Sequence, residues 1–135
     1  MLRMNLVDLV LGIKKKHHRQ MLAYENFFSQ NFSENTDDYS KFIQFYQTLN
    51  NEEKRLVSSF IEQSITDTTS SIFAWLDGVS FLEGQPKKSL ELKYEGEECK
   101  LNGHLQDIWL AIQEGCDVEE LREFYSNSVF YENET

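Results

Sequence analysis

Apolar residues recur at separations of three, four or seven through much of this chain, and that spacing constrains its fold more than any other feature. It places one apolar stripe along a helix, so it predicts amphipathic helices that pack their stripes together. The first such stretch runs from Met4 to about Gln30. The second lies between Tyr39 and Leu49, where aromatic residues gather on one face, and the polar segment "NFSENTDD" separates the two.

A third helix is expected to begin at "NNEEK". Asn50 and Glu53 have the spacing of a capping box, in which each side chain accepts a hydrogen bond from the other residue's backbone amide. The apolar face continues from Leu56 to Ile65. The polar run "TDTTSS" then either ends this helix or forms its solvent side, and we favour a break there before a further apolar helix that Gly78 stops.

After Gly78 the period changes from helical spacing to strict alternation. "VSFLEG" and "SLELKYEGE" alternate as strands do, and "EGQPKK" between them contains turn residues, so a small antiparallel hairpin is predicted. Helical spacing returns in "LNGHLQDIWLAIQEG", which Gly115 is placed to end. Asp117 and Glu120 form a second box-like pair that starts a last short helix, and the tail from Ser126 onward is expected to fray.

Together these elements predict a mainly α fold, with five to six helices and a small antiparallel β-hairpin. The chain has 135 residues, enough for one core and too few for two ordinary domains, so a single domain over residues 1–135 is expected. Its aromatic content of 13% is too high for a disordered chain.

The negative charge belongs to the later part of the chain. Residues 1–50 carry six Lys or Arg against five Asp or Glu, whereas residues 51–135 carry seven against eighteen. Such a field repels nucleic-acid phosphates and attracts basic partners. We therefore expect a basic protein as partner and no nucleic acid.

The cysteines and the N-terminus indicate the compartment. Cys99 and Cys116 lack the spacing of a zinc or redox motif, so no metal or cofactor is expected and a reducing, cytoplasmic location is favoured. Asp8 interrupts the first apolar run and no cleavage site follows, which is unlike a secretory signal. No run of about 18 apolar residues occurs, so no membrane span is expected.

The basic run "KKKHHR", from Lys14 to Arg19, has two readings. Basic residues on a helix can contact phosphate, and two histidines can hold a metal. However, the adjacent His17 and His18 point about 100° apart on a helix, whereas shared ligands are usually three or four residues apart. We interpret the run as a solvated charged face.

The acids in "YEGEECKLNGHLQD" allow a catalytic reading. Glu97 or Glu98 with Asp107 has the residue types of a general acid and base pair, which requires a cleft that the sequence does not indicate. His104 has no Ser or Cys nucleophile at a suitable spacing, and the order of acids does not match a calcium loop. We expect no enzyme and interpret these acids as a binding surface.

The stretch formed by "FAWLDGVSFLEG", "SLELKYEGE" and "LNGHLQDIWLAIQEG" resembles small bacterial proteins of polymorphic toxin loci, including contact-dependent growth inhibition immunity proteins. The resemblance covers roughly residues 70–125. It implies a cytoplasmic protein without catalysis that binds the toxin domain of a sister-cell effector and covers its active site. No functional residue carries over, because these proteins share no diagnostic motif.

Many such toxins are nucleases with basic surfaces that bind phosphate, so an acidic immunity surface would bind to the same basic surface. Asp77 follows the end of a predicted helix, where the helix dipole disfavours an acid, which hints at a use. Tyr94 or Tyr125 is the candidate aromatic anchor. The predicted partner-binding residues are Asp77, Tyr94, Glu95, Glu97, Glu98, Asp107, Glu114, Asp117, Glu119, Glu120, Glu123 and Tyr125.

Two other functions remain open from the sequence. An acidic mimic of nucleic acid would inhibit a DNA-binding enzyme with the same carboxylates, spaced like phosphates over a longer surface. A small hydrolase would lose turnover when Glu97, Glu98 or Asp107 is changed singly, with its fold intact.

Overall fold

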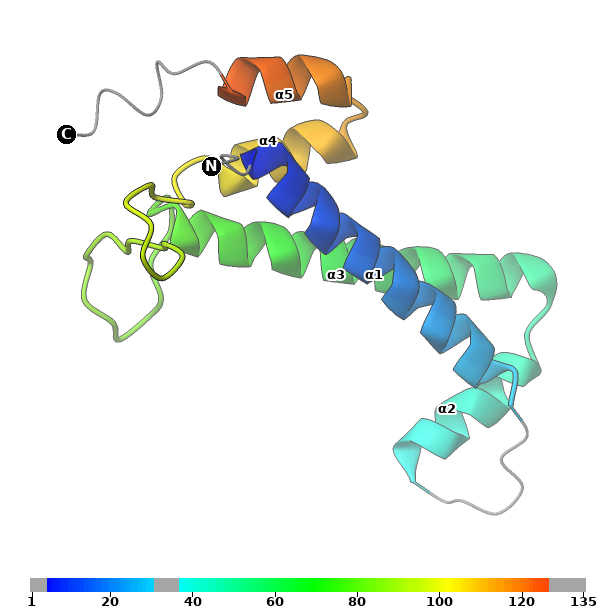
Figure 1. Ribbon diagram of the computed structural model, residues 1–135. Coiled ribbons are helices and arrows are strands. Elements are labelled where there is room, and N and C mark those ends of the chain that lie inside the picture. Colours follow the sequence, from blue (N-terminus) through cyan, green and yellow to red (C-terminus); the bar gives the residue numbers. More distant parts are fainter. Residues whose placement is uncertain (1–4, 31–36, 127–135) are drawn as a thin grey trace. The chain divides into compact units, whose positions relative to one another are not determined.

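The computed structural model describes residues 5–30 and 37–126 (Figure 1). Its helices are α1 (Leu6–Phe28), α2 (Asp38–Gln47), α3 (Asn51–Leu76), α4 (Leu105–Gln113) and α5 (Val118–Ser126). The chain divides into two compact units, and α1 and α3 each contribute residues to both. Residues 14–66 form the α2 unit, and residues 5–13 with 67–126 form the α4–α5 unit. The predicted mainly α fold is confirmed, and the predicted fraying tail beyond Ser126 lies outside the described residues.

In the α2 unit, the core is built around aromatic side chains. Phe28 near the end of α1 packs against Tyr46 and Phe42 of α2, with ring centroids 4.9 and 5.1 Å apart. Ile43 is buried beside them, and Val57 of α3 packs against the same cluster. Of the aromatic residues predicted to share one face of this helix, Phe42 and Tyr46 enter the core, whereas Tyr39 and Phe45 are 50% and 55% exposed.

Local hydrogen bonds set the starts of α2 and α3. Asp37 caps α2 by accepting a hydrogen bond from the backbone amide of Ser40, 2.7 Å away, and this bond lowers the pKa of the Asp37 carboxyl. At the start of α3, the amide of Glu53 donates to the Asn50 side chain and the amide of Asn50 donates to the Glu53 carboxylate, both at 2.8 Å. The predicted capping box is confirmed.

The break predicted at "TDTTSS" is wrong, because α3 continues through residues 66–71 to Leu76. Neither Gly nor Pro occurs in that run. The hydroxyl of Ser71 donates to the carbonyl of Asp67, four residues earlier, at 3.0 Å. Serine and threonine hydroxyls satisfied in this way fit a helix interior. The alternative reading, in which the run is part of the helix, is the one that holds.

The α4–α5 unit has the larger core. Trp109 of α4 is fully buried and contacts the ring of Phe73 of α3 edge to face, with centroids 5.8 Å apart. Figure 1 shows the first turns of α1 beside α4, and apolar residues of α1 complete the cluster. The buried members are Leu6, Val7, Val10, Phe73, Leu105, Ile108, Trp109, Ile112 and Tyr125.

Glycines end α3 and α4 as predicted. Gly78 has a φ of 77°, and the amides of Gly78 and Val79 donate to the carbonyls of Trp75 and Ala74. Gly115 repeats this geometry at the end of α4, with a φ of 83°. This is the Schellman motif, in which a residue in the left-handed conformation satisfies the last helical carbonyls.

The predicted β-hairpin is wrong, since the described residues contain no strand. Residues 79–104 connect α3 to α4 without regular structure, and the two alternating stretches do not pair with each other. The backbone of Leu92 bonds instead to Asn102 and Leu101. A lone two-stranded hairpin is only marginally stable in water, so these competing bonds are sufficient to replace it.

Asn102 organises this connection. Its side chain is buried, with the residue 6% exposed, and its amide nitrogen donates to the carbonyls of Leu76 and Leu90. Its amide oxygen accepts from the backbone N–H of Leu92 at 2.8 Å. One side chain thus satisfies a carbonyl of the last turn of α3 and holds the connecting segment against the unit.

We predict that Asn102→Ala lowers the free energy of unfolding by about 2 kcal/mol, because it removes three hydrogen bonds and leaves buried backbone groups without partners. Urea unfolding followed by tryptophan fluorescence measures the change, since both tryptophans, Trp75 and Trp109, belong to this unit. Gln113→Ala, at an exposed position of α4, is the matched control. A loss as small as that of the control would contradict the role of Asn102.

Candidate functional site

Asp77 has a structural role in the free chain. It follows the last residue of α3, and its two carboxylate oxygens accept hydrogen bonds from the backbone amides of Gly103 and Gln106, at 2.6 and 2.8 Å. These amides lie at the start of α4, where His104 precedes the helix without a capping bond from its own side chain. An acid that is unfavourable at the end of α3 is therefore favourable at the positive end of α4.

Tyr125 lies in the core of the α4–α5 unit and is 8% exposed. Burial raises the pKa of its hydroxyl, and the negative charges of Asp107 and Asp77 raise it further. Its ring contacts those of His104 and Phe124. As an anchor for a partner, Tyr125 is poorly accessible in this conformation.

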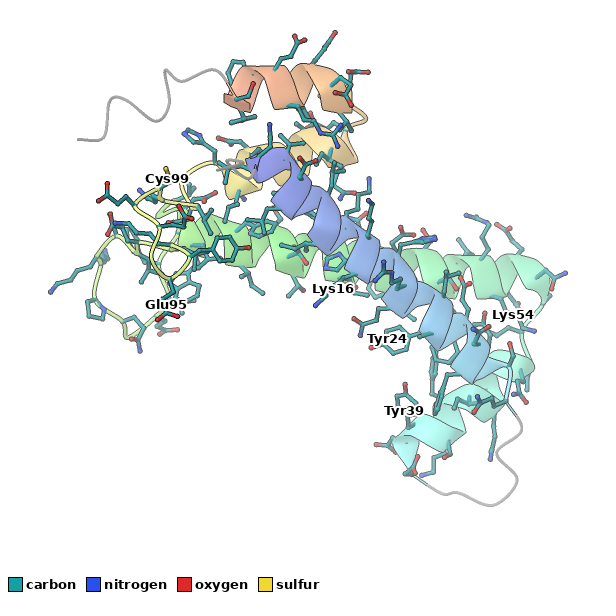
Figure 2. All side chains as sticks on the ribbon, in the orientation of Figure 1. Lys16, Tyr24, Tyr39, Lys54, Glu95 and Cys99 are labelled. Carbon is teal, nitrogen blue, oxygen red and sulfur yellow. The ribbon has the colours of Figure 1, made fainter. Side chains whose placement is uncertain are left out.

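Four predicted residues lie together on the connection between α3 and α4: Tyr94, Glu95, Glu97 and Glu98. All four are exposed, and a turn joins them, with the amide of Glu97 donating to the carbonyl of Tyr94 at 3.0 Å. Figure 2 labels Glu95 and Cys99 on this segment. The connection therefore exposes its acids to solvent, while the hydrogen bonds of Asn102 hold it against the α4–α5 unit.

The catalytic reading finds little geometric support in these positions. Glu97, Glu98 and Asp107 are all exposed, whereas a general acid and base pair works in a cleft that excludes water. Asp107 lies 3.9 Å from the His104 ring nitrogen Nδ1, an ion pair when that imidazole is protonated. No hydrogen bond or ion pair among the described residues joins Asp107 to either glutamate.

The remaining predicted acids surround α5. Glu114 and Asp117 precede the helix, and Glu119, Glu120 and Glu123 lie on it, all of them exposed. Asp117 caps α5 by accepting from the amide of Glu120 at 3.0 Å, which confirms the predicted start of the last helix. Figure 2 shows oxygen-bearing side chains along the side of α5 that faces away from α4.

Arg122 fastens α5 to the start of α1. Its guanidinium donates two hydrogen bonds to one oxygen of Asp8, at 2.8 and 3.0 Å, and it also pairs with Glu119. The bonds to the Asp8 carboxylate raise the pKa of Arg122, because they favour its charged form. The Asn5 side chain, just before α1, donates to the Arg122 carbonyl at 3.2 Å. The side chain and the backbone of Arg122 are therefore both bonded at the start of α1.

Phe124 was missed by the sequence analysis. It is 55% exposed, while Val118, Leu121 and Tyr125 of the same helix pack against the core. A helical projection would have found it, because position 124 lies outside the stripe of 118, 121 and 125 and directly above Glu120, four residues earlier. We call Glu119, Glu120, Glu123 and Phe124 the outer face of α5.

The basic run on α1 fits a solvated face. Lys14, Lys15, Lys16, His18 and Arg19 are exposed. His17 is partly buried, and this burial lowers its pKa, so it favours the neutral form. Within the described ranges no three His, Cys, Asp or Glu residues lie close enough together to hold a metal ion.

Comparisons with known proteins identify no relative from which the function of these surfaces could be inferred. Family models, curated proteins and solved structures were searched, and none of the three searches found a match. No helix in the described part of the chain is sufficiently long and apolar to cross a membrane. Partner binding stays a prediction. Exposure and charge support it for the predicted acids other than Asp77, whereas Tyr125 is buried.

We predict that Asp77→Ala lowers the free energy of unfolding by about 1 to 3 kcal/mol, because the charged cap of α4 is lost. Asp77→Asn should cost less, since one oxygen still accepts a hydrogen bond. Urea unfolding of the free protein measures both, with Glu98→Ala on the exposed connection as control. If Asp77 served only to contact a partner, the stability of the free protein would not change.

Proposed function

We propose that this protein is an immunity-type inhibitor that binds a basic, nuclease-like toxin domain and covers its active site. The surface assigned to this role is the outer face of α5, with Glu114 and Asp117 beside it in the chain. Exposure of three glutamates and a phenylalanine on one short, well-anchored helix is the observation that carries the proposal.

The composition of this face favours protein binding. Aromatic side chains are common at the energetic centres of protein interfaces, and charged groups around them direct the encounter. Phe124 supplies the aromatic group, and Glu120, four residues earlier, lies next to it on the helix surface. The face therefore combines an apolar contact with a negative field.

Charge complementarity indicates the class of partner. Residues 105–126 contain six acids, Asp107, Glu114, Asp117, Glu119, Glu120 and Glu123, against the single basic Arg122, a net charge of −5. Arg122 is itself engaged with Asp8 and Glu119. A protein that binds nucleic acid through lysines and arginines presents the opposite field, so an inhibitor with this face would compete for the same groups.

The anchoring of α5 also suits an inhibitor. Its inner side packs on the core through Val118, Leu121 and Tyr125, and Arg122 ties it to α1. A surface held in one conformation before binding loses less conformational entropy when the partner arrives. The outer face is thus preorganised in the free protein.

Capture of the tagged protein from its native cells, with washes at low and at high salt and identification by mass spectrometry, supplies the partner. The proposal expects one basic domain whose nuclease activity is blocked in the complex. Recovery of general nucleic-acid machinery, or of no specific protein, would contradict it.

With that domain in hand, Glu120→Lys combined with Glu123→Lys is expected to slow association at least tenfold at low salt, and the difference should shrink as salt screens the charges. Phe124→Ala should mainly speed dissociation, because it removes the apolar contact with the partner. Surface plasmon resonance measures both rate constants.

The matched control reverses two exposed acids of the α2 unit, Glu25→Lys with Glu62→Lys, and changes the net charge equally. An equal slowing by the control would mean that net charge alone matters. In that case α5 is not the binding face.

A further inference from the structure

Residues 89–95, which we call the edge segment, bond through the backbone of Leu90 and Leu92 to residues 101 and 102. The carbonyl of Leu90 accepts from Asn102, and Leu92 donates to Asn102 and accepts from Leu101, at 2.7 to 2.8 Å. Alternate residues of an extended chain direct their backbone groups to the same side. The bonds of Leu90 and Leu92 to one neighbouring segment therefore fit an extended chain with its even-numbered residues directed inward.

The odd-numbered residues leave a second edge open. Among the described residues, no hydrogen bond uses the backbone N–H or C=O of Glu91 or Lys93. Such unpaired groups on an extended segment are a template for a further strand. In an extended chain the side chains alternate as well, which places Leu90, Leu92 and Tyr94 on one face and Glu91 and Lys93 on the other.

From this edge we infer that the segment pairs with the same segment of a second copy of this chain, as an antiparallel two-stranded ribbon centred on Leu92. In that register Glu91 of each copy lies opposite Lys93 of the other. Each such pair exchanges two backbone hydrogen bonds, because both residues direct their free groups outward. Leu92 meets Leu92, and Leu90 meets Tyr94.

Charge and the turn at residues 94–97 together select this register among the symmetric ones. A ribbon centred on Tyr94 would also pair Lys93 with Glu95, but it would run into that turn. A ribbon centred on Glu91 would place two glutamates opposite each other, and one centred on Lys93 would do the same with two lysines. Like charges directly opposite destabilise a strand pair, whereas opposite charges stabilise it. Only the register centred on Leu92 therefore gives two favourable charge pairs and a continuous apolar face.

The exposed side chains provide the apolar contact. Leu90 and Leu92 are each 38% exposed and Tyr94 is 50% exposed. Pairing would therefore bury apolar surface that is exposed to solvent in the monomer. Glu91 and Lys93 already contact each other within one copy, at 3.2 Å, on the exposed face. The arrangement is two-fold symmetric and closes on itself, so it forms a dimer and not a filament.

A ribbon of this length is a small interface, and we expect a dimer that dissociates on dilution, with a dissociation constant of roughly 10 μM to 1 mM. Sedimentation equilibrium of the full chain over this range measures it. The inference is independent of the proposed function, since it concerns the free protein and the connection between α3 and α4. A chain that stays monomeric at every concentration would overturn the inference. This includes the outcome in which the edge segment binds a strand of another protein instead of a second copy.

Charge exchange tests the register. Glu91→Lys alone and Lys93→Glu alone should each weaken the dimer about tenfold or more, because two opposite-charge pairs become like-charge pairs. The double variant, Glu91→Lys with Lys93→Glu, should restore dimerisation, and so should an equimolar mixture of the two single variants. Glu62→Lys, an exposed change in the α2 unit, is the control and should leave the dimer unchanged.

Amide hydrogen exchange distinguishes this edge from any other dimer contact. The N–H groups of Glu91 and Lys93 should become protected as protein concentration rises, whereas that of Leu92 should be protected at all concentrations by its bond to Asn102. Equal exchange of Glu91 and Lys93 in the monomer and the dimer would overturn the inference. Failure of the double variant to restore dimerisation would overturn the register.

Discussion

Two polar side chains, Asp77 and Asn102, determine how the α4–α5 unit is closed. The Asp77 carboxylate binds the first amides of α4, and the Asn102 amide binds the last turn of α3 and the chain between the two helices. Apolar packing of Trp109 and its neighbours supplies the bulk of the stabilisation, but it does not specify direction. The two polar residues fix where α4 begins relative to α3, and hence how α4 is oriented in the unit.

Local patterns in the sequence predicted most helix boundaries, because the interactions that set them span only a few residues. The capping box of Asn50 and Glu53 and the glycine ends at Gly78 and Gly115 are of this kind. The break predicted in α3 failed because serine and threonine are typical of turns and also fit within a helix when their hydroxyls bond back to the previous turn.

Contacts between distant residues were beyond that reading. Asn102 bonds to residues 10, 12 and 26 positions away, and it replaced the predicted hairpin. Asp77 was expected to face a partner because its real partners, the amides of Gly103 and Gln106, are 26 and 29 residues along the chain. The acids of α5 were found from composition alone, whereas Phe124 was overlooked among the apolar residues that pack inward.

The exposed connection between α3 and α4 also bears on how the chain could be cut. All described residues from 79 to 98 are exposed, while the core of the α4–α5 unit takes Val10 and Phe73 from before this segment and Trp109 and Tyr125 from after it. A protease that cleaves near Pro86 would sever the polypeptide without separating the halves of that core. The two fragments would remain associated, and the same site would accept an inserted tag or new chain termini.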